Sequence, residues 1–466
     1  MRIGQDHEKL SSLSRNFGVE VLSSGKVPAW ITWALERSGR LKVRKSPLQP
    51  RIVFWLVVGM MLWRNESIPA VFGLLISGIR GRVGDLSLRP VTEGALTHAR
   101  RRLGVRPFRL FFRKLGEEVQ PPPSFRGHRV WAIDGTRLSV LDTPENLRVF
   151  GRRKVHRGRA AFCELSMVCL VDAARHMVRD AVFGLWDASE LRGARRLLSH
   201  VAAHDLVILD RFFFGLPFFQ EILAHGAHFL CRVSGQPRLQ AIPGTRQRHQ
   251  YEAWMTRRVP WEPGDVRTGW GTMKTVRLRV RVIDYRLRGH GRVRLVTSLL
   301  DREKYPAQEL AVLYHTRWEI EIAFDEIKTH QNANAHGQLQ TTFRSKTPRN
   351  VLQEAYALLA AYNLVRRTMV DAAQPHEIDP RRLSFLDSLR AIQWMAPRMQ
   401  SASTALLPDL YRRLLLDVAE TRLVRFRRPR GYARVVRVKM SNFKLKRPRH
   451  RQVLRDYASM IRKAVA

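Results

Sequence analysis

LYHTRWEIEIAFDEIKTHQ, residues 313–331, has the apolar spacing of an amphipathic helix. At about 100° per residue, four polar side chains of different chemistry would share a stripe roughly 60° wide. They are Tyr314, Arg317, Glu321 and Lys328. A helix that buries the apolar stripe beside them would present an aromatic ring, an acid and two cations along one edge. This arrangement predicts a site that holds a metal ion and a phosphodiester together.

The same charges would also fit a helix face that is simply exposed to water. Glu321 can pair with Arg317, and Asp325 can pair with Lys328, as ordinary neighbours on a helix surface. The stretch alone does not separate these two interpretations, so the rest of the chain has to.

The composition indicates a polyanionic partner. The chain has 466 residues, of which 82 are Lys or Arg and 40 are Asp or Glu, giving a formal net charge of +42. An excess of this size points to nucleic acid or to an anionic membrane surface. Arg outnumbers Lys, which favours bidentate contacts to phosphate groups. Hydrophobic residues make up 45% of the chain, which is enough for a large core in two or three domains.

Cysteine usage and hydropathy indicate an intracellular protein. Cys163, Cys169 and Cys231 form no CxxC pair, and their apolar surroundings predict buried strand cysteines rather than disulfides or a metal cluster. The N-terminus has no apolar signal core. The longest apolar run, residues 52–63, is too short to cross a bilayer and predicts a core helix. We therefore expect a cytoplasmic protein with no membrane partner.

Residues 1–120 are expected to form a helical N-terminal DNA-binding domain. Thr92 is a candidate N-cap, and the basic segment after it predicts two short helices around Gly104. The first of these helices ends in an arginine cluster. Within that cluster, Arg100 and Arg101 are candidate contacts to a DNA duplex, although a solvated basic face would show the same pattern.

Three consecutive prolines, residues 121–123, mark a boundary, and the hydrophobic period then changes to that of strands. Residues 124–370 predict a mixed α/β sheet with helices on both sides, interrupted at residues 234–297 by a β-rich insertion with a cationic face. The runs HRVWAID and LVILD each end in an acid, Asp134 and Asp210. At the ends of neighbouring strands these carboxylates would meet, although either acid could instead cap a turn.

Asp134, Asp210 and Glu321 together form a candidate metal site. Carboxylate oxygens are hard ligands that suit Mg²⁺ or Mn²⁺. Two such ions can activate the attacking oxygen and stabilise the leaving one in an in-line displacement. Three further acids remain rivals on sequence alone: Asp142, Asp325 and Glu326. The chain has no Walker A sequence and no well-placed GxGxxG, so neither ATP nor a dinucleotide is expected.

The last segment, residues 371–466, is expected to be a basic C-terminal region. Residues 422–451 contain no acid, and Phe426, Tyr432 and Phe443 are interleaved with the cations. Basic and aromatic residues in this combination are typical of nucleic-acid surfaces. We expect the region to contact DNA or a second copy of the chain.

The chain resembles the DDE transposases of the insertion sequence 4 family. Tyr314, Arg317, Glu321 and Lys328 reproduce the Y-(2)-R-(3)-E-(6)-K signature of that family. The segments AIDGT, VILDRFFFG and LQTTFRSKTPRNVLQEAYALLAAYNLVRR are similar to it as well, and the resemblance covers residues 27–370.

The resemblance implies an RNase H-like catalytic core, preceded by the helical N-terminal domain and followed by the basic C-terminal region. By the signature, the catalytic and metal-binding triad consists of Asp134, Asp210 and Glu321. The implied contacts to the transposon end, including the phosphate near a flipped base, are Tyr314, Arg317 and Lys328.

The implied chemistry is nicking at terminal inverted repeats, hairpin formation or second-strand release, and strand transfer into target DNA. The resemblance implies two Mg²⁺ ions per active site, with Mn²⁺ as a substitute. It further implies a homodimer assembled on DNA in the bacterial cytoplasm, at the nucleoid.

Two other functions stay open on sequence alone. A catalytically silent, transposase-derived DNA-binding protein would occupy element ends without cutting them. A structure-specific nuclease on the same core would cut DNA without joining it. The presence of all three acids argues against the silent protein, and a strand-transfer assay separates the nuclease from the transposase.

Overall fold

A computed structural model describes residues 27–42, 48–83, 91–155, 158–160, 162–233, 239–260, 273–286, 292–331, 343–423, 434–435 and 444–445. The chain divides into two compact units. Unit 1 comprises Met1–Gln120, Gly135–Gly193 and Ile320–Val424, and unit 2 comprises Pro121–Asp134, Ala194–Glu319 and Arg425–Ala466. The units interleave along the chain, whereas the sequence suggested three consecutive domains.

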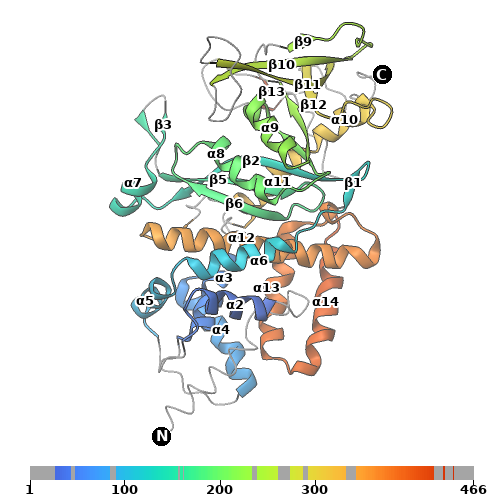
Figure 1. Ribbon diagram of the computed structural model, residues 1–466. Helices are drawn as coiled ribbons and strands as arrows, with labels where there is room; N and C mark the ends of the chain where they lie inside the picture. Colours follow the sequence, from blue (N-terminus) through green and yellow to red (C-terminus); the bar gives the residue numbers. More distant parts are fainter. Residues whose placement is uncertain are drawn as a thin grey trace. The chain divides into compact units, whose positions relative to one another are not determined.

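Helices from both ends of the chain pack together in unit 1 (Figure 1). They are α2 (Val27–Arg37), α3 (Pro50–Leu62), α4 (Ile68–Val83), α5 (Glu93–Leu103), α6 (Arg106–Glu117), α12 (Pro348–Ala373), α13 (Phe385–Ser401) and α14 (Leu407–Glu420). α3 lies against α12, and its residues 52–62 are all buried, as an uninterrupted apolar sequence requires. α13 packs on α4. The described residues 371–423 therefore belong to the helical core of unit 1, and most of residues 424–466 lie outside the described part.

The two basic helices expected around Gly104 are confirmed. Thr92 caps α5, since its hydroxyl accepts a hydrogen bond from the Ala95 amide at 3.2 Å. Gly104 ends α5 with a φ of 74°, a conformation that glycine adopts without strain. The Gln353 side chain of α12 donates to the carbonyl oxygens of Arg100 and Gly104 at 3.0 and 2.8 Å. These bonds satisfy the end of α5 and fix it to the long helix.

Strand β2 (His128–Val140) begins in unit 2 and ends in unit 1. The run HRVWAID therefore does not end as a strand at Asp134, because β2 continues to Val140. Gly135 marks a close approach instead of a turn: a Cβ atom there would lie 2.6 Å from Cδ of Glu190. Glu190 begins α8 (Glu190–Leu197). The other unit 1 strands, β5 (Cys163–Asp172) and β6 (Val178–Gly184), form an antiparallel pair, and α7 (Pro144–Phe150) precedes them.

Unit 2 contains parallel strands: β2 pairs with β7 (Leu206–Leu209), and β7 pairs with β8 (His228–Arg232). α9 (Leu216–Ala224) connects β7 to β8 and packs on β8 through Phe219, whose ring stacks on Phe229 with centroids 4.0 Å apart. Asp205, at the start of β7, accepts hydrogen bonds from Arg129 and Trp131 of β2 at 2.7 and 3.0 Å. The buried carboxylate thereby holds these two strands in register.

The β-rich insertion is confirmed within the described residues. β9 (Leu239–Ala241), β10 (Gln250–Pro260), β11 (Met273–Arg286) and β12 (Arg292–Thr297) form antiparallel pairs, and β12 returns to pair with β8 (Figure 1). The mixed α/β architecture with a helical N-terminal region is therefore confirmed. The expected RNase H-like core agrees with this strand arrangement. Unit 1 contains an antiparallel pair, unit 2 contains three parallel strands, and β2 runs through both units.

The stretch 313–331 is not one continuous helix, so the stripe calculated for it does not hold. α10 (Ala307–His315) ends before Arg317, α11 (Trp318–Asp325) comes next, and residues Glu326–His330 form a π-helical turn. The Thr316 hydroxyl bonds to the Leu313 carbonyl oxygen at 2.7 Å, and the Arg317 amide bonds to the Tyr314 carbonyl oxygen at 3.1 Å. These short-range bonds interrupt the helical ladder.

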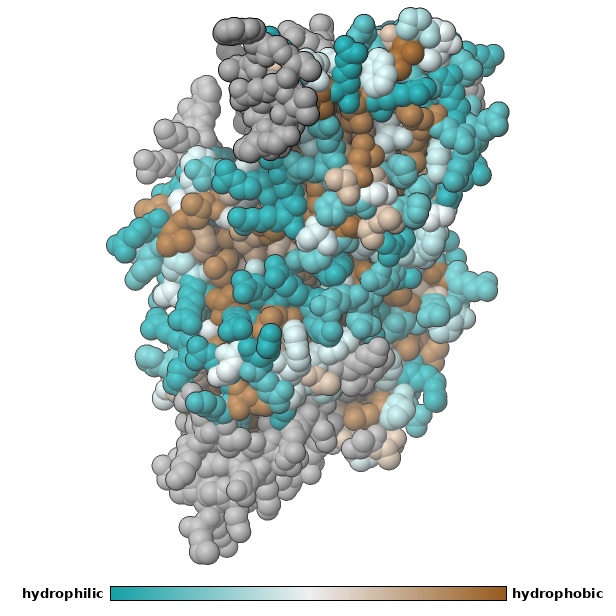
Figure 2. All heavy atoms as spheres, viewed as in Figure 1, coloured by the Kyte–Doolittle hydropathy of each residue, from teal (hydrophilic) through white to brown (hydrophobic). Residues whose placement is uncertain are grey.

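Hydrophilic side chains cover most of the face drawn in Figure 2, with smaller hydrophobic patches among them. Among the described residues, no helix is both long and apolar enough to span a bilayer. Cys163, Cys169 and Cys231 are buried free thiols, as expected.

Candidate active site

Asp134 and Asp210 lie side by side in unit 2. Ile133 of β2 is paired with Leu209 of β7 in the parallel register. Asp134 follows Ile133 within β2, and Asp210 follows the last residue of β7. Neighbouring strands lie about 5 Å apart, so the two aspartates occupy adjacent positions. Asp210 has an extended backbone, and its side chain does not cap the turn after it. The alternative in which Asp210 serves as a turn cap is therefore not supported.

Arg317 reaches the first of these acids. Its Nη1 lies 3.4 Å from Oδ2 of Asp134, and the two side chains are 9% and 19% exposed. The guanidinium also lies over the ring of Trp318, 5.2 Å from its centroid. A planar cation held between a carboxylate and an aromatic face is well suited to bind phosphate.

Tyr314 belongs to the same cluster of unit 2. Burial is the largest influence and raises the pKa of its hydroxyl; the charge of Arg317 lowers this pKa, and Cys231 and Asp210 raise it. The hydroxyl is buried, and among the described residues no group bonds to it. A neutral donor that has lost water without gaining a protein partner is available to a ligand.

Burial raises the pKa of the Cys231 thiol, and the nearby charge of Asp210 raises it further. The Cys231 sulfur lies 3.4 Å from the carbonyl oxygen of Asp210. A thiol that remains protonated at this place is a packing group beside the carboxylate. It is not a nucleophile.

The other two signature residues belong to unit 1. Glu321 lies on α11, and Lys328 lies in the π-helical turn after it; both side chains are partly exposed. Their side chains are thus presented by one continuous segment that begins directly after Arg317.

The three rival acids are each held by a partner within unit 1. Asp142 is paired with Arg152, Asp325 accepts a hydrogen bond from Thr329 at 2.9 Å, and Glu326 is paired with Arg366. Glu326 is also fully buried, at 2% exposure. Its full burial makes Glu326 a poor candidate for open metal coordination.

Glu190 is an acid that sequence reasoning missed. Its carboxyl group lies against the backbone of Gly135, the residue directly after Asp134, and its side chain is partly exposed. No signal in the sequence could have found it, because 54 residues separate Glu190 from Gly135 and only the fold brings them together.

The expected DNA contacts on α5 divide into two kinds. Arg100 is 3% exposed and is ion-paired with the fully buried Glu354 at 2.6 Å, and it bonds to Ser345 at 2.9 Å. We correct the expectation for Arg100, since a guanidinium committed to the interior is not a surface contact. Arg101 is exposed and remains a candidate.

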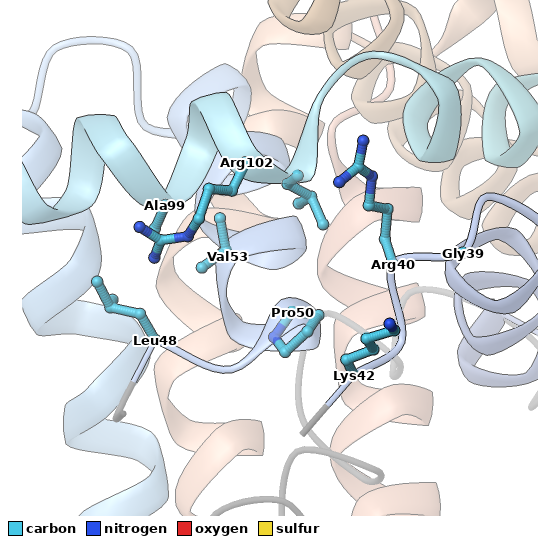
Figure 3. Close-up of a pocket in the computed structure, with 9 residues that line it drawn as sticks. Gly39, Arg40, Lys42, Leu48, Pro50, Val53, Ala99 and Arg102 are labelled. Carbon is cyan, nitrogen blue, oxygen red and sulfur yellow. The ribbon is translucent and has the colours of Figure 1, made fainter. Parts of the chain in front are cut away.

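A cationic pocket of about 180 Å³ lies on the same helix in unit 1. Arg40, Lys42 and Arg102 extend around Val53 and Pro50 in Figure 3. All three cations are exposed, and none forms an ion pair with another residue that the structure describes. A groove with unpaired cations and an apolar floor is suited to a nucleic-acid backbone, with phosphates on the cations and sugar on the floor.

A second cationic hollow, of about 620 Å³, lies in the insertion of unit 2. Arg246, Arg248, Arg286 and Arg292 contribute to its lining, against one acid, Asp284. The expected cationic face of the insertion is therefore present on the described strands.

No group of three His, Cys, Asp or Glu side chains in the described part of the chain forms a complete metal centre. Asp134 and Asp210 nevertheless fit a divalent ion. They offer hard oxygen ligands at adjacent positions, and the unsatisfied hydroxyl of Tyr314 lies in their cluster.

Comparisons with known proteins identify the family. Residues 125–364 match the transposase DDE domain, and residues 17–113 match the insertion element 4 transposase N-terminal domain. The chain is 30% identical over 424 residues to transposase InsG for insertion sequence element IS4 of Escherichia coli strain K12, covering 88% of this chain and 90% of the relative. The chain belongs to the DDE transposases of the insertion sequence 4 family.

Two further similarities are weaker. The transposase is 27% identical over 190 residues to the putative transposase InsZ of Escherichia coli strain K12, which covers 40% of this chain and 61% of that relative. A cryo-EM structure of the piggyBac transposase synaptic complex with hairpin DNA has a TM-score of 0.40 and 11% identity, over 85% of this chain and 84% of the other.

The activity of the chain is therefore that of a DNA transposase, which binds DNA, cleaves it and transfers its strands. A divalent metal requirement is typical of the family.

Proposed function

We propose that this transposase cuts the terminal inverted repeats of an insertion sequence and joins the ends to target DNA as a homodimer, using two Mg²⁺ ions per active site. The observation that carries the proposal is the register of β2 and β7, which brings Asp134 next to Asp210 with Arg317 3.4 Å from the first acid. We expect it to act at the bacterial nucleoid.

Asp134, Asp210 and Glu321 hold the metal ions in this proposal. When bound, the ions supply Lewis-acid activation of the attacking oxygen and stabilise charge on the leaving oxygen. The Arg317 guanidinium lies 3.4 Å from the Asp134 carboxylate, and the attraction between the two charges helps to orient this proposed ligand.

Arg317, Tyr314 and Lys328 bind the transposon end. The Arg317 guanidinium can form charge-assisted hydrogen bonds to a phosphate. The Tyr314 hydroxyl can donate to a phosphate oxygen, since it is protonated and unsatisfied. These groups orient the scissile phosphodiester against the carboxylates, and correct orientation by itself lowers the barrier substantially.

The N-terminal helices would bind DNA away from the cleavage chemistry. Phosphate groups of the DNA backbone would bind, whatever the base sequence, to Arg101 and to the three cations of the pocket in Figure 3. The basic residues 424–466 would add contacts to DNA or to the second copy.

The test uses a labelled duplex that carries the terminal repeat of the element, a target plasmid, and Mg²⁺ present or absent. Wild type, Asp210→Asn and Glu321→Gln are compared with Asp187→Asn, an exposed acid outside the cluster that serves as the matched control. Metal-dependent joined products should form with wild type and the control and disappear in the other two variants.

Other results would change the proposal in defined ways. Cleavage without joining would favour a nuclease, and binding without cleavage would favour a silent DNA-binding protein. Full activity of Glu321→Gln would remove that acid from the triad. Gel filtration of the DNA complex with light scattering tests the homodimer, which a single chain per DNA end pair would contradict.

A further inference from the structure

The π-helical turn Glu326–His330 is anchored at its start by a buried ion pair. Oε2 of Glu326 is ion-paired with Arg366 and accepts a hydrogen bond from the Tyr362 hydroxyl at 2.9 Å. Glu326 is 2% exposed and Arg366 is 0% exposed. A second nitrogen contact of Arg366 reaches Nδ1 of His176 at 2.8 Å. All four groups belong to unit 1 and none faces water.

The side-chain amide of Gln331 anchors the end of the same turn. Gln331 is 3% exposed, and its side-chain nitrogen donates to the carbonyl oxygens of Met61 in α3 and Leu358 in α12 at 3.3 and 3.4 Å. Lys328 therefore lies between two fixed points five residues apart. Its backbone has little freedom to move independently of them.

The spacing of the two anchors requires the π geometry. Residues five positions apart on a regular α-helix lie roughly 140° apart around the axis, so Glu326 and Gln331 could not both face the interior. Instead, the backbone N–H of Gln331 donates to the backbone carbonyl oxygen of Glu326 at 2.8 Å. A bond between residues five positions apart is the bond of a π-helix. Both side chains then face α12, and the turn is one residue wider than an α-helical turn.

The width of this turn sets the angle between Glu321 and Lys328. On a regular helix the two would lie about 20° apart, and each extra residue accommodated in a turn rotates the later residues of the helix relative to the earlier ones. The orientation of Lys328, the proposed phosphate contact, relative to Glu321, the proposed metal ligand, therefore depends on the anchored segment.

Stability alone is a poor explanation of the ion pair. Burying two charges costs free energy that their attraction only partly offsets, and apolar residues of similar size often serve as well or better. Burial disfavours the charged form of Glu326, but Arg366 and His176 outweigh it and hold the pKa of that carboxyl below its usual range. The pair is a permanent charged contact at neutral pH and makes the turn geometrically specific.

We propose that Glu326 is a positioning residue, whose ion pair with Arg366 fixes the π-helical turn and thereby holds Lys328 in place for a DNA phosphate. This inference rests on the proposed function, in which Lys328 contacts the transposon end.

A double-mutant cycle on the full chain tests it. Lys328→Ala is made in three backgrounds: wild type, Glu326→Gln/Arg366→Met, and Glu354→Gln/Arg100→Met. The last is the matched control, because Arg100–Glu354 is another buried ion pair of unit 1 that is not part of the turn. Neutralising both partners avoids leaving one buried charge alone. The readouts are duplex affinity against salt, the cleavage rate, and the unfolding temperature.

In wild type and in the control background, Lys328→Ala should slow cleavage. It should also make the plot of log duplex affinity against log salt concentration less steep, by about one released counterion. In the Glu326→Gln/Arg366→Met background it should change neither, because Lys328 is already out of place. Equal effects of Lys328→Ala in all three backgrounds would overturn the proposal. Tyr362→Phe, which keeps both charges, provides a second measurement and should slow cleavage by a smaller factor.

Failure of the proposed function would look different. A wild-type chain that neither binds nor cuts the element end contradicts that function, whereas an active wild type with additive substitutions contradicts only the positioning role.

Discussion

Two sets of charged groups in this transposase differ in their surroundings. In the interior of unit 1, Glu354 and Glu326 are each fully buried against a guanidinium. In unit 2, Asp134 and Asp210 are partly exposed, adjacent to each other in the strand register, and Asp134 has Arg317 at the longer distance of 3.4 Å. The first arrangement commits the acids to buried partners, and the second leaves them partly exposed, where a metal ion can reach them. Replacing acids by amides should therefore have opposite consequences in the two regions.

The largest expected effect is on catalysis at the exposed acids. Asp134→Asn and Asp210→Asn should each reduce cleavage by more than the roughly 10- to 100-fold that follows loss of a group supporting a metal ligand. Two adjacent carboxylates repel each other, so Asp210→Asn should not lower the unfolding temperature. Cleavage rates and thermal unfolding measured on the same samples check this, and a strongly destabilised Asp210→Asn would break the comparison.

The buried acid should show the reverse. Glu354→Gln leaves Arg100 without its anion in the interior, which costs about 3–5 kcal/mol in typical proteins. The free energy of unfolding from urea titration should fall by this amount, while cleavage per folded molecule stays near wild type. Loss of specific activity without loss of stability would place Glu354 with the functional acids.

Arg100 and Arg102 extend the comparison to cations two residues apart on α5. Arg102 is exposed in the pocket with Arg40 and Lys42, whereas Arg100 is buried. Replacing the three pocket cations with Ala should lower the salt slope of duplex binding by about three counterions. Arg398→Ala, an exposed cation on α13, is the matched control. Equal slopes for the triple variant and wild type would exclude the pocket from DNA binding.

The smallest expected effect concerns two histidines. His176 of unit 1 contacts Arg366 and lies beside Glu326. For His228 of unit 2, burial together with the nearby His128, His204 and Lys304 lowers the pKa to about 4. Because the folded pKa is below the unfolded value near 6.5, the unfolded chain binds the proton more tightly. Stability is then complete above pH 6.5 and falls toward pH 4.

The loss should be on the order of 1–2 kcal/mol after allowance for the partial exposure of the ring. His228→Asn can keep the bond to the Ser298 hydroxyl, which lies 3.1 Å from Nδ1. With this substitution, the unfolding temperature should change less with pH between pH 4 and 6.5. An unchanged dependence on pH would show that His228 is not the group responsible.

The sequence determined the parts of the protein that depend on local chemistry. Thr92 predicted a helix start and Gly104 a helix end, because capping hydrogen bonds and a positive φ are satisfied within a few residues. Apolar runs before Asp134 and Asp210 predicted the strands that lead to these acids, and alternating basic and apolar residues predicted the insertion. The signature at Tyr314, Arg317, Glu321 and Lys328 identified the family.

Tertiary structure decided the features that depend on partners distant in sequence. Arg100 and Arg101 are chemically identical in the sequence, and only the approach of Glu354 from α12 separates the buried one from the exposed one. The stretch 313–331 has a continuous helical period, yet it is interrupted before α11 and widened at Glu326, where a buried ion pair and a buried amide outweigh the regular ladder. Sequence periodicity shows which side chains are apolar. The direction in which each side chain of a helix points also depends on the positions of the partners of its buried charges.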